Sequence, residues 1–334
     1  MPVLVTGGAG YIGSHAAHAL AARGENVIVL DNLVAGSRAF VPRAATFFLG
    51  SAEDSELVLH VIKDCGIDAV MHFAGSIIVP ESIEHPLDYY RNNTAASLAL
   101  IRTCVSSHVR HFIFSSTAAV YGTTDMAPVD EALLARPLNP YGWSKLMTEW
   151  MLSDASRAHD FSYIALRYFN VAGVASNSGP GQPERQVPHL IKRAAQVALG
   201  CAEHLDIYGT DYPTPDGTAV RDYIHICDLV DAHLLALDYL RSGGGSNIFN
   251  CGYGTGSSVR EVVAALEKAT GLPLPVRNAP RRAGDAPFVV ANSERLAKIL
   301  GWKPKLNQLD VMVRSALDWE RRVHLEHESQ KRQL

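Results

Sequence analysis

A tyrosine and a lysine stand four residues apart in the segment "NPYGWSKLMTEW", which begins at Asn139. Asn139 suits an N-cap and Pro140 suits a first helical turn, so we expect a helix to begin here. Tyr141 and Lys145 then share one helix face. A phenol is a poor base near neutral pH, but a nearby ammonium stabilises the phenolate and lowers its pKa. The pair can therefore take a proton from an alcohol while a hydride leaves the same carbon.

The first polar turn of the chain indicates where the hydride acceptor binds. The segment "TGGAGYIG" follows an apolar run directly and opens a helical pattern, and Gly7, Gly10 and Gly13 fit G-x-x-G-x-x-G. Such glycines allow a tight turn and let backbone N–H groups reach a pyrophosphate at a helix N-terminus. Alone, the pattern also fits a turn without a ligand. Its place between a strand and a helix favours a dinucleotide.

Asp31 ends the second apolar run, 18 residues after Gly13. A carboxylate at that place accepts hydrogen bonds from an adenosine ribose and repels a 2′-phosphate, so NAD is favoured over NADP. The alternative is that Asp31 is only a turn residue or N-cap.

A third motif, "SSTAAVYG", begins at Ser115 at the end of another apolar run. Ligands of open α/β sheets bind at the carboxyl ends of the strands. Thr117 can hydrogen-bond the reacting oxygen and orient its proton there. Ser115 and Ser116 are expected to be structural or to face the cofactor.

These motifs need a framework, and the first half of the chain predicts one. Apolar β-rich runs alternate with helical patterns, which implies an α/β fold with a Rossmann-type, doubly wound parallel sheet. The loop-rich second half predicts a smaller C-terminal α+β substrate lobe. We expect a cofactor domain over residues 1–169 and a mainly substrate-binding domain over 170–334, with some segments returning to the first. The expected strands are Val3–Thr6, Asn26–Leu30, Ala69–Ala74, His111–Ser116 and Tyr163–Phe169. The expected helices are Ile12–Arg23, Glu53–Cys65, Pro86–Ser107, Tyr141–His159, His189–Gly200, Asp228–Arg241, Val259–Thr270 and Glu294–Leu300. The polar tail after Trp319 is expected to fray.

Composition narrows the class of protein. The 334 residues are 47% hydrophobic and carry a net charge of −4, which supports a folded core and argues against nucleic acid or a membrane surface as partner. Neither a secretory signal nor a membrane-spanning run is evident. The five cysteines are scattered and predict reduced thiols in a cytoplasmic protein. The Cys and His spacings predict no metal site.

The helix of Tyr141 carries a second pattern. Trp143, Leu146, Met147, Trp150 and Met151 form one apolar stripe that faces nearly opposite to the Tyr–Lys pair. The stripe must be covered by another part of the chain or by a second subunit. We expect a two-fold homodimer, with ordinary intrachain core as the alternative.

Together, several segments resemble the UDP-glucose 4-epimerases of the extended short-chain dehydrogenase/reductase family, over residues 1 to about 320. These segments are "TGGAGYIGSH", "LDNL", "HFAG", "FSSTAAVYG", "PYGWSK", "LRYFNVAG", "DYPTPDGTAVRDYIH" and "PRRAGD". The resemblance implies tightly bound NAD and interconversion of UDP-glucose and UDP-galactose. A hydride would leave sugar C4 and return to its other face after the 4-keto sugar rotates.

The resemblance also implies roles for individual residues. The catalytic residues would be Tyr141, Lys145 and Thr117. The cofactor would contact Gly7, Gly10, Tyr11, Ile12, Gly13, Asp31, Asn32, Phe73, Ala74, Gly75, Asn92, Ser115, Tyr141, Lys145 and Tyr168. The UDP-sugar would contact Thr117, Tyr141, Asn170, His189, Leu190, Ile207, Tyr208, Arg221, Tyr223, Arg282 and Asp285. Two positions depart from the family: Ser51 replaces an acidic contact to adenine, and Ile77 stands where many members have a lysine.

Other readings remain open on the sequence. A 4,6-dehydratase of the same fold usually has an Asp-Glu pair after the threonine, where Ala118 and Ala119 stand here. An epimerase or decarboxylase acting on UDP-glucuronate is a second alternative. A non-catalytic NAD-binding protein is a third, although such proteins commonly lose the Tyr–Lys pair.

Overall fold

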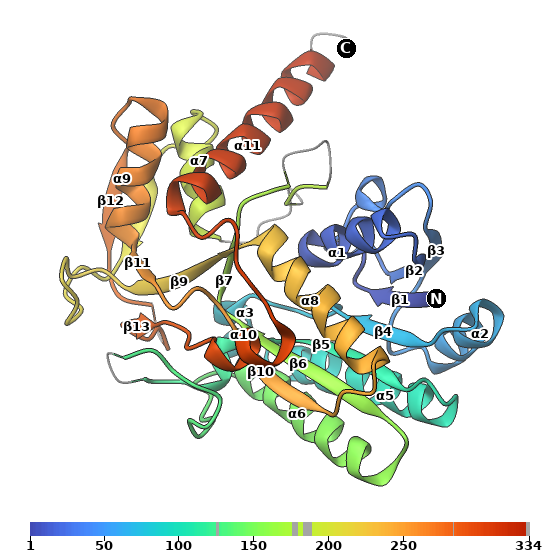
Figure 1. The fold of residues 1–334 in the computed structure, drawn as a ribbon. Helices are drawn as coiled ribbons and strands as arrows, with labels where there is room; N and C mark the ends of the chain where they lie inside the picture. The colour runs from blue at the N-terminus through green and yellow to red at the C-terminus, as the bar shows by residue number, and fades with distance from the viewer. Residues whose placement is uncertain (125–126, 176–179, 183–188, 283, 332–334) are drawn as a thin grey trace.

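The computed structural model describes residues 1–124, 127–175, 180–182, 189–282 and 284–331 (Figure 1). Its central feature is a seven-stranded sheet of order β10-β6-β5-β4-β1-β2-β3, in which every neighbouring pair is parallel. The predicted α/β fold is therefore confirmed. The strands are β1 (Pro2–Thr6), β2 (Asn26–Asp31), β3 (Thr46–Leu49), β4 (Ala69–His72), β5 (His111–Thr117), β6 (Ser162–Tyr168) and β10 (Asn247–Cys251).

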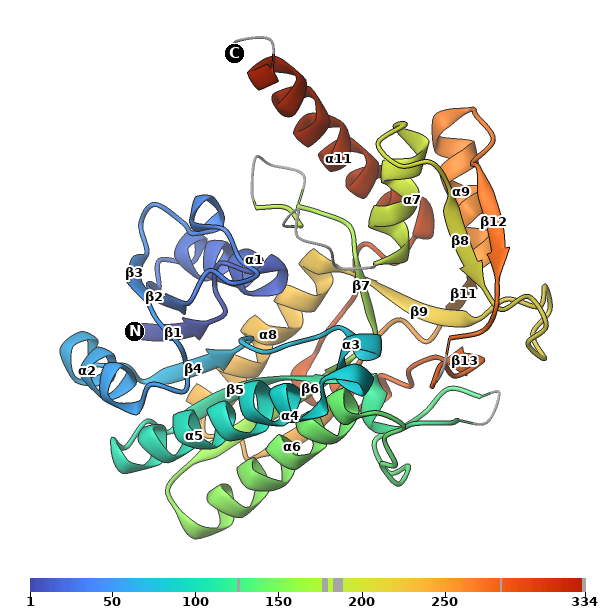
Figure 2. The ribbon, with the colours of Figure 1, turned by 180° about the vertical axis from the view of Figure 1, so that it is seen from behind.

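Helices cover both faces of this sheet (Figures 1 and 2). The helices α1 (Tyr11–Ala22), α8 (Ile226–Arg241) and α10 (Glu294–Leu300) pack on one face, and α2 (Ser55–Cys65), α5 (Ala96–Ser106) and α6 (Pro140–Ala158) on the other. Successive side chains of one strand enter opposite cores: Val3 and Val5 pack toward the α8 side, and Leu4 packs toward the α2 side. This double burial explains why the strands are almost wholly apolar.

A smaller lobe packs at one end of the sheet. Its strands are β7 (Asn170–Ala172), β8 (Leu205–Tyr208), β9 (Val220–His225), β11 (Gly256–Ser258), β12 (Val276–Ala279) and β13 (Phe288–Val289). Its helices are α7 (Leu190–Ala198), α9 (Val259–Thr270) and α11 (Leu309–Lys331), which share a separate apolar core. Strand β10 and helix α8 lie within the second half of the chain, but β10 pairs with β6 in the large sheet and α8 packs on one face of that sheet.

One expectation about helices is wrong, and the structure adds detail to another. The tail after Trp319 was expected to fray, but α11 continues to Lys331 and projects from the lobe in Figure 1. The helix expected over 86–107 is continuous from Pro86 to Ser106, but its middle is π-helical, so it is described as α4 (Pro86–Tyr89), η2 (Tyr90–Ala95) and α5. The short helix α3 (Val79–Glu84) precedes it.

The stripe on α6 is divided between two environments. Leu146 is buried with Trp143 against the loop that follows β5, and Met151 packs on the core shared with α2 and α5. Trp150 leaves 52% of its surface exposed. Intrachain core therefore covers part of the stripe. Within the described residues, none of the helices combines the length and apolar character needed to cross a bilayer.

Candidate active site

A cleft of about 1190 Å³ opens where the carboxyl ends of the sheet strands meet the smaller lobe. This edge is where ligands of open α/β sheets bind. Most of the residues predicted from sequence line it. They are Gly7, Gly10, Tyr11, Ile12, Gly13, Asp31, Asn32, Phe73, Ala74, Gly75, Asn92, Ser115, Thr117, Tyr141, Tyr168, Asn170, His189, Arg221, Arg282 and Asp285.

The glycine turn forms one wall of the cleft, and two of its glycines are sterically required. Gly7 has a φ of 70°, and a Cβ there would lie 2.6 Å from the backbone nitrogen of Ala74. A Cβ on Gly13 would lie 2.2 Å from the carbonyl oxygen of Gly7. Helix α1 begins after Gly10 without a side-chain cap, so its first-turn N–H groups, which have no intrahelical partner, stay available to an anion.

Asp31 fixes this turn from the end of β2. Its Oδ2 accepts the N–H of Ala9 at 3.0 Å, and its Oδ1 accepts the N–H of Leu33 at 2.7 Å. A carboxylate has about four acceptor sites, so ribose hydroxyls can still bind. The glycine turn and the open N-terminus of α1 suit the pyrophosphate of a dinucleotide. The Asp31 carboxylate suits an adenosine ribose that carries no 2′-phosphate. The alternative that Asp31 is a turn residue is also partly right, because the carboxylate holds the turn.

The π-helical segment turns two neighbouring asparagines toward one loop. The Nδ2 of Asn92 donates to the hydroxyl of Ser76 at 2.8 Å. Asn93 accepts the N–H of Ser76 at 2.7 Å and donates to its carbonyl at 3.0 Å and to the hydroxyl of Ser144 at 3.0 Å. Ser144 also donates to the carbonyl of Tyr141. These bonds connect the loop that contains Ser76 to the start of α6.

Two of the three predicted catalytic side chains, Thr117 and Tyr141, line the cleft, and the third, Lys145, is buried outside its lining. Asn139 caps α6 by accepting the N–H of Gly142 at 2.9 Å, as the sequence predicted. The hydroxyl of Thr117 lies close enough to the Tyr141 phenol to influence its pKa, and both line the cleft. The Nζ of Lys145 donates to the carbonyl of Ser115 at 3.0 Å, so the ammonium is held directly beneath the end of β5.

The pKa of Tyr141 differs from the simple expectation. Burial raises the pKa of Tyr141, and the nearby Thr117 hydroxyl acts in the opposite direction. Burial also lowers the pKa of Lys145 to about 8. Desolvation of the phenolate is the dominant influence on this pKa, so the expected lowering by Lys145 is not what decides its direction. A further positive charge is needed in the cleft to reverse the direction.

The end of β5 is held by its neighbours. Ser115 and Tyr168 share a hydrogen bond between their hydroxyls. Ser116 points the other way, as alternation along a strand requires, and donates to Glu149 on α6. Ser115 therefore faces the cleft, and Ser116 is structural, so the two serines divide the two roles considered from sequence.

The smaller lobe supplies the cationic end of the cleft. The Nη2 of Arg221 pairs with Oδ1 of Asp285 at 2.6 Å. The guanidinium of Arg282 lies 3.8 Å from the ring centre of Tyr208, in cation–π geometry. Two arginines at one end of a cleft suit a diphosphate.

Five predicted ligand contacts lie outside the lining of this cleft, namely Lys145, Leu190, Ile207, Tyr208 and Tyr223. Leu190 and Tyr223 line a small adjoining pocket with Asn170. The side chain of Ile207 is buried, and Tyr208 reaches the cleft through its stack with Arg282. His189 occupies the N-cap of α7 without a capping side-chain bond, and burial lowers its pKa to about 4, so it is neutral near pH 7.

Sequence reasoning missed several residues of the site. Ser76, Ile78 and Glu81 line the cleft from the segment after β4, and Gln182 lines it near the smaller lobe. Asn93 was also overlooked, although the doublet at 92–93 was a signal. Both asparagines belong to the π-helical segment, and such turns are frequent at functional sites.

Comparison with known proteins agrees with this geometry. Residues 3–252 match the model of the "NAD dependent epimerase/dehydratase family". A UDP-glucose 4-epimerase from Azospirillum brasilense is 54% identical over 96% of this chain and 92% of its own.

Solved structures give the same result. The UDP-glucose 4-epimerase of Brucella ovis in complex with NAD is 40% identical, with a TM-score of 0.91 over 95% of this chain and 98% of its own. The Bifidobacterium longum enzyme in complex with NAD+ and UDP is 38% identical, with a TM-score of 0.92 over 96% of this chain and 98% of its own. The chain therefore belongs to the NAD dependent epimerase/dehydratase family and, within it, to the group of UDP-glucose 4-epimerases.

Proposed function

We propose that this protein inverts the configuration at C4 of UDP-glucose, giving UDP-galactose, by transient oxidation with tightly held NAD. The observation that carries the proposal is the convergence of Tyr141, Thr117 and the glycine turn on one cleft. The names of its relatives support the substrate, since a chain 54% identical over most of its length is a UDP-glucose 4-epimerase.

Tyr141 is proposed as the proton acceptor. Its phenolate takes the proton of the sugar 4-hydroxyl, and Thr117 hydrogen-bonds the reacting oxygen and orients that proton. Lys145, one turn along α6, donates to the Ser115 carbonyl at the end of β5 and would add a positive charge to the buried site. Bound NAD supplies a hydride acceptor beside C4 and the positive ring that favours the phenolate. Tyr141 gives the proton back once the sugar has turned its other face.

We assign cofactor binding to the domain of the large sheet. We assign the pyrophosphate to the N-terminus of α1 at Gly10–Gly13, and the adenosine ribose to Asp31 and Asn32. Asn92, Phe73, Ala74 and Gly75 follow the dinucleotide along the cleft toward Ser115 and Tyr168. Ser51 lines the adenine end, and its hydroxyl accepts the N–H of Glu53 at 3.2 Å.

The UDP moiety is assigned to the second lobe. Arg221 and Arg282 would bind the diphosphate, and Asp285 the uridine ribose, so the Arg221–Asp285 ion pair would be shared with the ligand. Asn170, His189 and Leu190 are placed near the phosphates, with Ile207, Tyr208 and Tyr223 around the uridine. A firm hold on UDP and a loose hold on the hexose allow both faces of C4 to meet the cofactor. We keep the division into residues 1–169 and 170–334 for the two tasks.

We also propose a homodimer that works in the cytoplasm. Trp150 on α6 and Leu98 on α5 each leave about half of the side chain exposed, and Leu87 on α4 leaves 79% exposed. Exposed large apolar groups on adjacent helices favour a two-fold contact. Sedimentation should give a dimer for the wild type and a monomer for Trp150→Glu.

All five cysteines are free thiols, in line with a reducing compartment.

The function is tested with purified protein and no added cofactor. UDP-glucose should be converted to UDP-galactose until both are present at equilibrium, with no net NADH. A 4-keto-6-deoxy sugar as product would indicate a 4,6-dehydratase, and unchanged substrate with bound NAD would indicate a binding protein.

A further inference from the structure

A buried ion pair lies behind the catalytic side chains without lining the cleft. Glu149 on α6 and Arg167 on β6 meet through two bonds, Nε to Oε1 at 2.9 Å and Nη2 to Oε2 at 2.6 Å. Their side chains are 2% and 6% exposed. A fully buried ion pair is weak evidence for stability, because its attraction is offset by desolvation and apolar residues can do as well. The pair therefore invites a functional explanation.

The carboxylate end of the pair reaches the catalytic strand. Glu149 accepts a hydrogen bond from the hydroxyl of Ser116, which is 1% exposed. Ser116 lies between Ser115, whose carbonyl holds the ammonium of Lys145, and Thr117, whose hydroxyl lies near the Tyr141 phenol in the cleft. The bond thus fixes the end of β5 against α6, the helix that carries Tyr141 and Lys145.

The guanidinium end reaches the segment that follows the same strand. Arg167 donates from Nη1 to the hydroxyl of Tyr121 at 3.0 Å and lies 5.0 Å from the centre of its ring. Tyr121 donates to Oδ1 of Asn250 at 2.6 Å, and Nδ2 of Asn250 donates to the carbonyl of Val129 at 2.9 Å. The turn Ala118–Val120 is therefore held between Thr117 and Tyr121.

We propose that Ser116, Glu149, Arg167 and Tyr121 form a positioning network that keeps Thr117 in register with Tyr141. This inference rests on the proposed function, in which Thr117 orients the proton that Tyr141 accepts. None of the four residues is a catalytic residue, because they act through the end of β5 and the start of α6. The network fixes the position of the Thr117 hydroxyl oxygen. A displacement of about 1 Å at such a group can lower the rate about a hundredfold.

The test uses two variants that leave the ion pair in place. Ser116→Ala removes the link to β5, and Glu149 keeps both bonds to Arg167. Tyr121→Phe removes the hydroxyl link and keeps the ring. Ser156→Ala is the matched control, since Ser156 is on the same helix and bonds only the carbonyl of Ser153 among the contacts described. All are assayed as the NAD-loaded protein with UDP-glucose.

We expect kcat to fall about 10- to 100-fold in Ser116→Ala and in Tyr121→Phe, with KM for UDP-glucose changed less than about twofold and the melting temperature within about 3 °C of wild type. The acid limb of the kcat–pH profile should move to higher pH, because a displaced Thr117 hydroxyl stabilises the Tyr141 phenolate less. The charged or titratable groups facing Tyr141 are Lys145 on its own helix, Tyr89 of α4 and Tyr168 of β6, and neither variant alters them.

Several results would overturn the proposal. The variants could match Ser156→Ala in kcat and pH profile, or lose activity only in proportion to lost melting temperature, as a purely structural role requires. A wild type that fails to make UDP-galactose would overturn the proposed function and this inference with it. An active wild type with unaffected variants would overturn this inference alone.

Discussion

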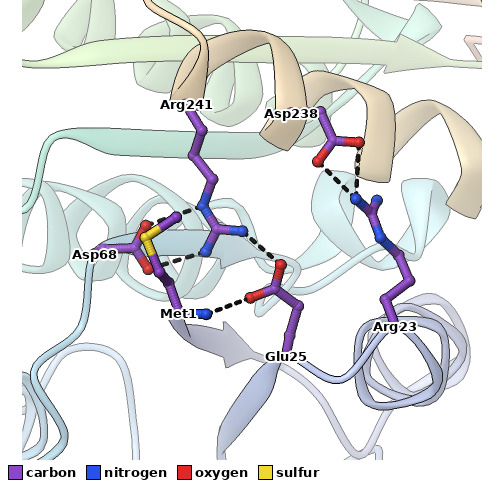
Figure 3. Close-up of polar contacts among 6 residues, drawn as sticks. All are labelled: Met1, Arg23, Glu25, Asp68, Asp238 and Arg241. Atoms are coloured by element: carbon purple, nitrogen blue, oxygen red, sulfur yellow. Dashed lines mark hydrogen bonds and ion pairs between the residues drawn. The ribbon is translucent and has the colours of Figure 1, made fainter.

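All strands of the central sheet begin on one side, here called the amino edge, and end on the opposite side, the carboxyl edge. Each of these edges carries an arginine–carboxylate network, and the two networks have different consequences. At the amino edge, Arg241 of α8 bonds both oxygens of Asp68 at 3.0 Å and Glu25 at 2.7 Å, and the Met1 amino group bonds Glu25 at 2.8 Å (Figure 3). At the carboxyl edge, Arg167 and Glu149 are buried beneath Thr117. The amino-edge network ties α8 to the starts of three strands, far from the cleft.

The difference follows from the fold. In a parallel sheet all carboxyl ends lie together, and the loops that leave them form the ligand cleft. Polar groups at that edge can be positioned for chemistry, whereas those at the amino edge can only hold elements together. Loss of the first network should therefore change turnover, and loss of the second should change stability alone.

The largest expected effect on stability comes from breaking the carboxyl-edge pair. Glu149→Ala leaves the Arg167 guanidinium buried without its partner, which typically costs about 3–5 kcal/mol. Urea unfolding monitored by circular dichroism should show this loss. A change below about 1 kcal/mol would mean that water or a neighbour replaces the carboxylate.

An intermediate effect is expected at the amino edge. Arg241→Ala removes bonds to two carboxylates that are partly exposed, so we expect a loss of about 1–2 kcal/mol with kcat per folded molecule unchanged. A loss of kcat beyond the folded fraction would contradict the division between the two edges.

The amino-edge network also predicts that the stability it contributes depends on pH. Partial burial of Glu25 works to raise its pKa, but hydrogen bonds from the Met1 amino group and Arg241 outweigh it, so the folded-state pKa is lowered. A lowered carboxylate pKa contributes stability above the unfolded value of about 4.3, and this contribution is lost as the pH falls through the folded value. The stability difference between wild type and Arg241→Ala should thus shrink below about pH 4. A difference that grows on acidification would contradict this assignment.

The smallest effect is expected beside that network. Arg23 and Asp238 pair at 2.7 Å on the surface, with side chains 37% and 47% exposed. Exposed pairs contribute little, so Arg23→Ala should cost less than about 0.5 kcal/mol, and less again in high salt. Thermal unfolding at low and high salt measures both. A loss of stability equal to that of Arg241→Ala would show that solvent exposure does not explain the difference between the two ion pairs.

Much of the catalytic edge could be predicted from sequence because its signals are local. The glycine turn, the strand end at Thr117 and the capped helix of Tyr141 each occupy fewer than about twelve consecutive residues, and periodicity places them on a strand or helix. The alternation of elements then brings their ends to one edge of a parallel sheet.

The networks could not be predicted, because their partners are distant in sequence. Nothing local to Arg241 indicates that it meets Asp68 and Glu25, and nothing local to Arg167 indicates Glu149 or Tyr121. The π-helical turn at 90–95 and the pairing of β10 with β6 likewise depend on tertiary packing, which overrides local preference. The fraying expected after Trp319 was wrong because the first half of α11 packs against α7 and α9 and carries the polar half with it.

The central claim is that Tyr141 is the base at the carboxyl edge, and tyrosinate absorbance during a pH titration tests it most directly. In the protein stripped of NAD, Tyr141 should ionise above pH 10, because burial raises its pKa. In the NAD-loaded protein, one tyrosine should ionise well below pH 10, at the same midpoint as the acid limb of kcat, and Tyr141→Phe should abolish that signal while lowering kcat about 10²- to 10⁴-fold. A NAD-loaded protein in which the low-pH signal is missing, or survives Tyr141→Phe, would contradict the account.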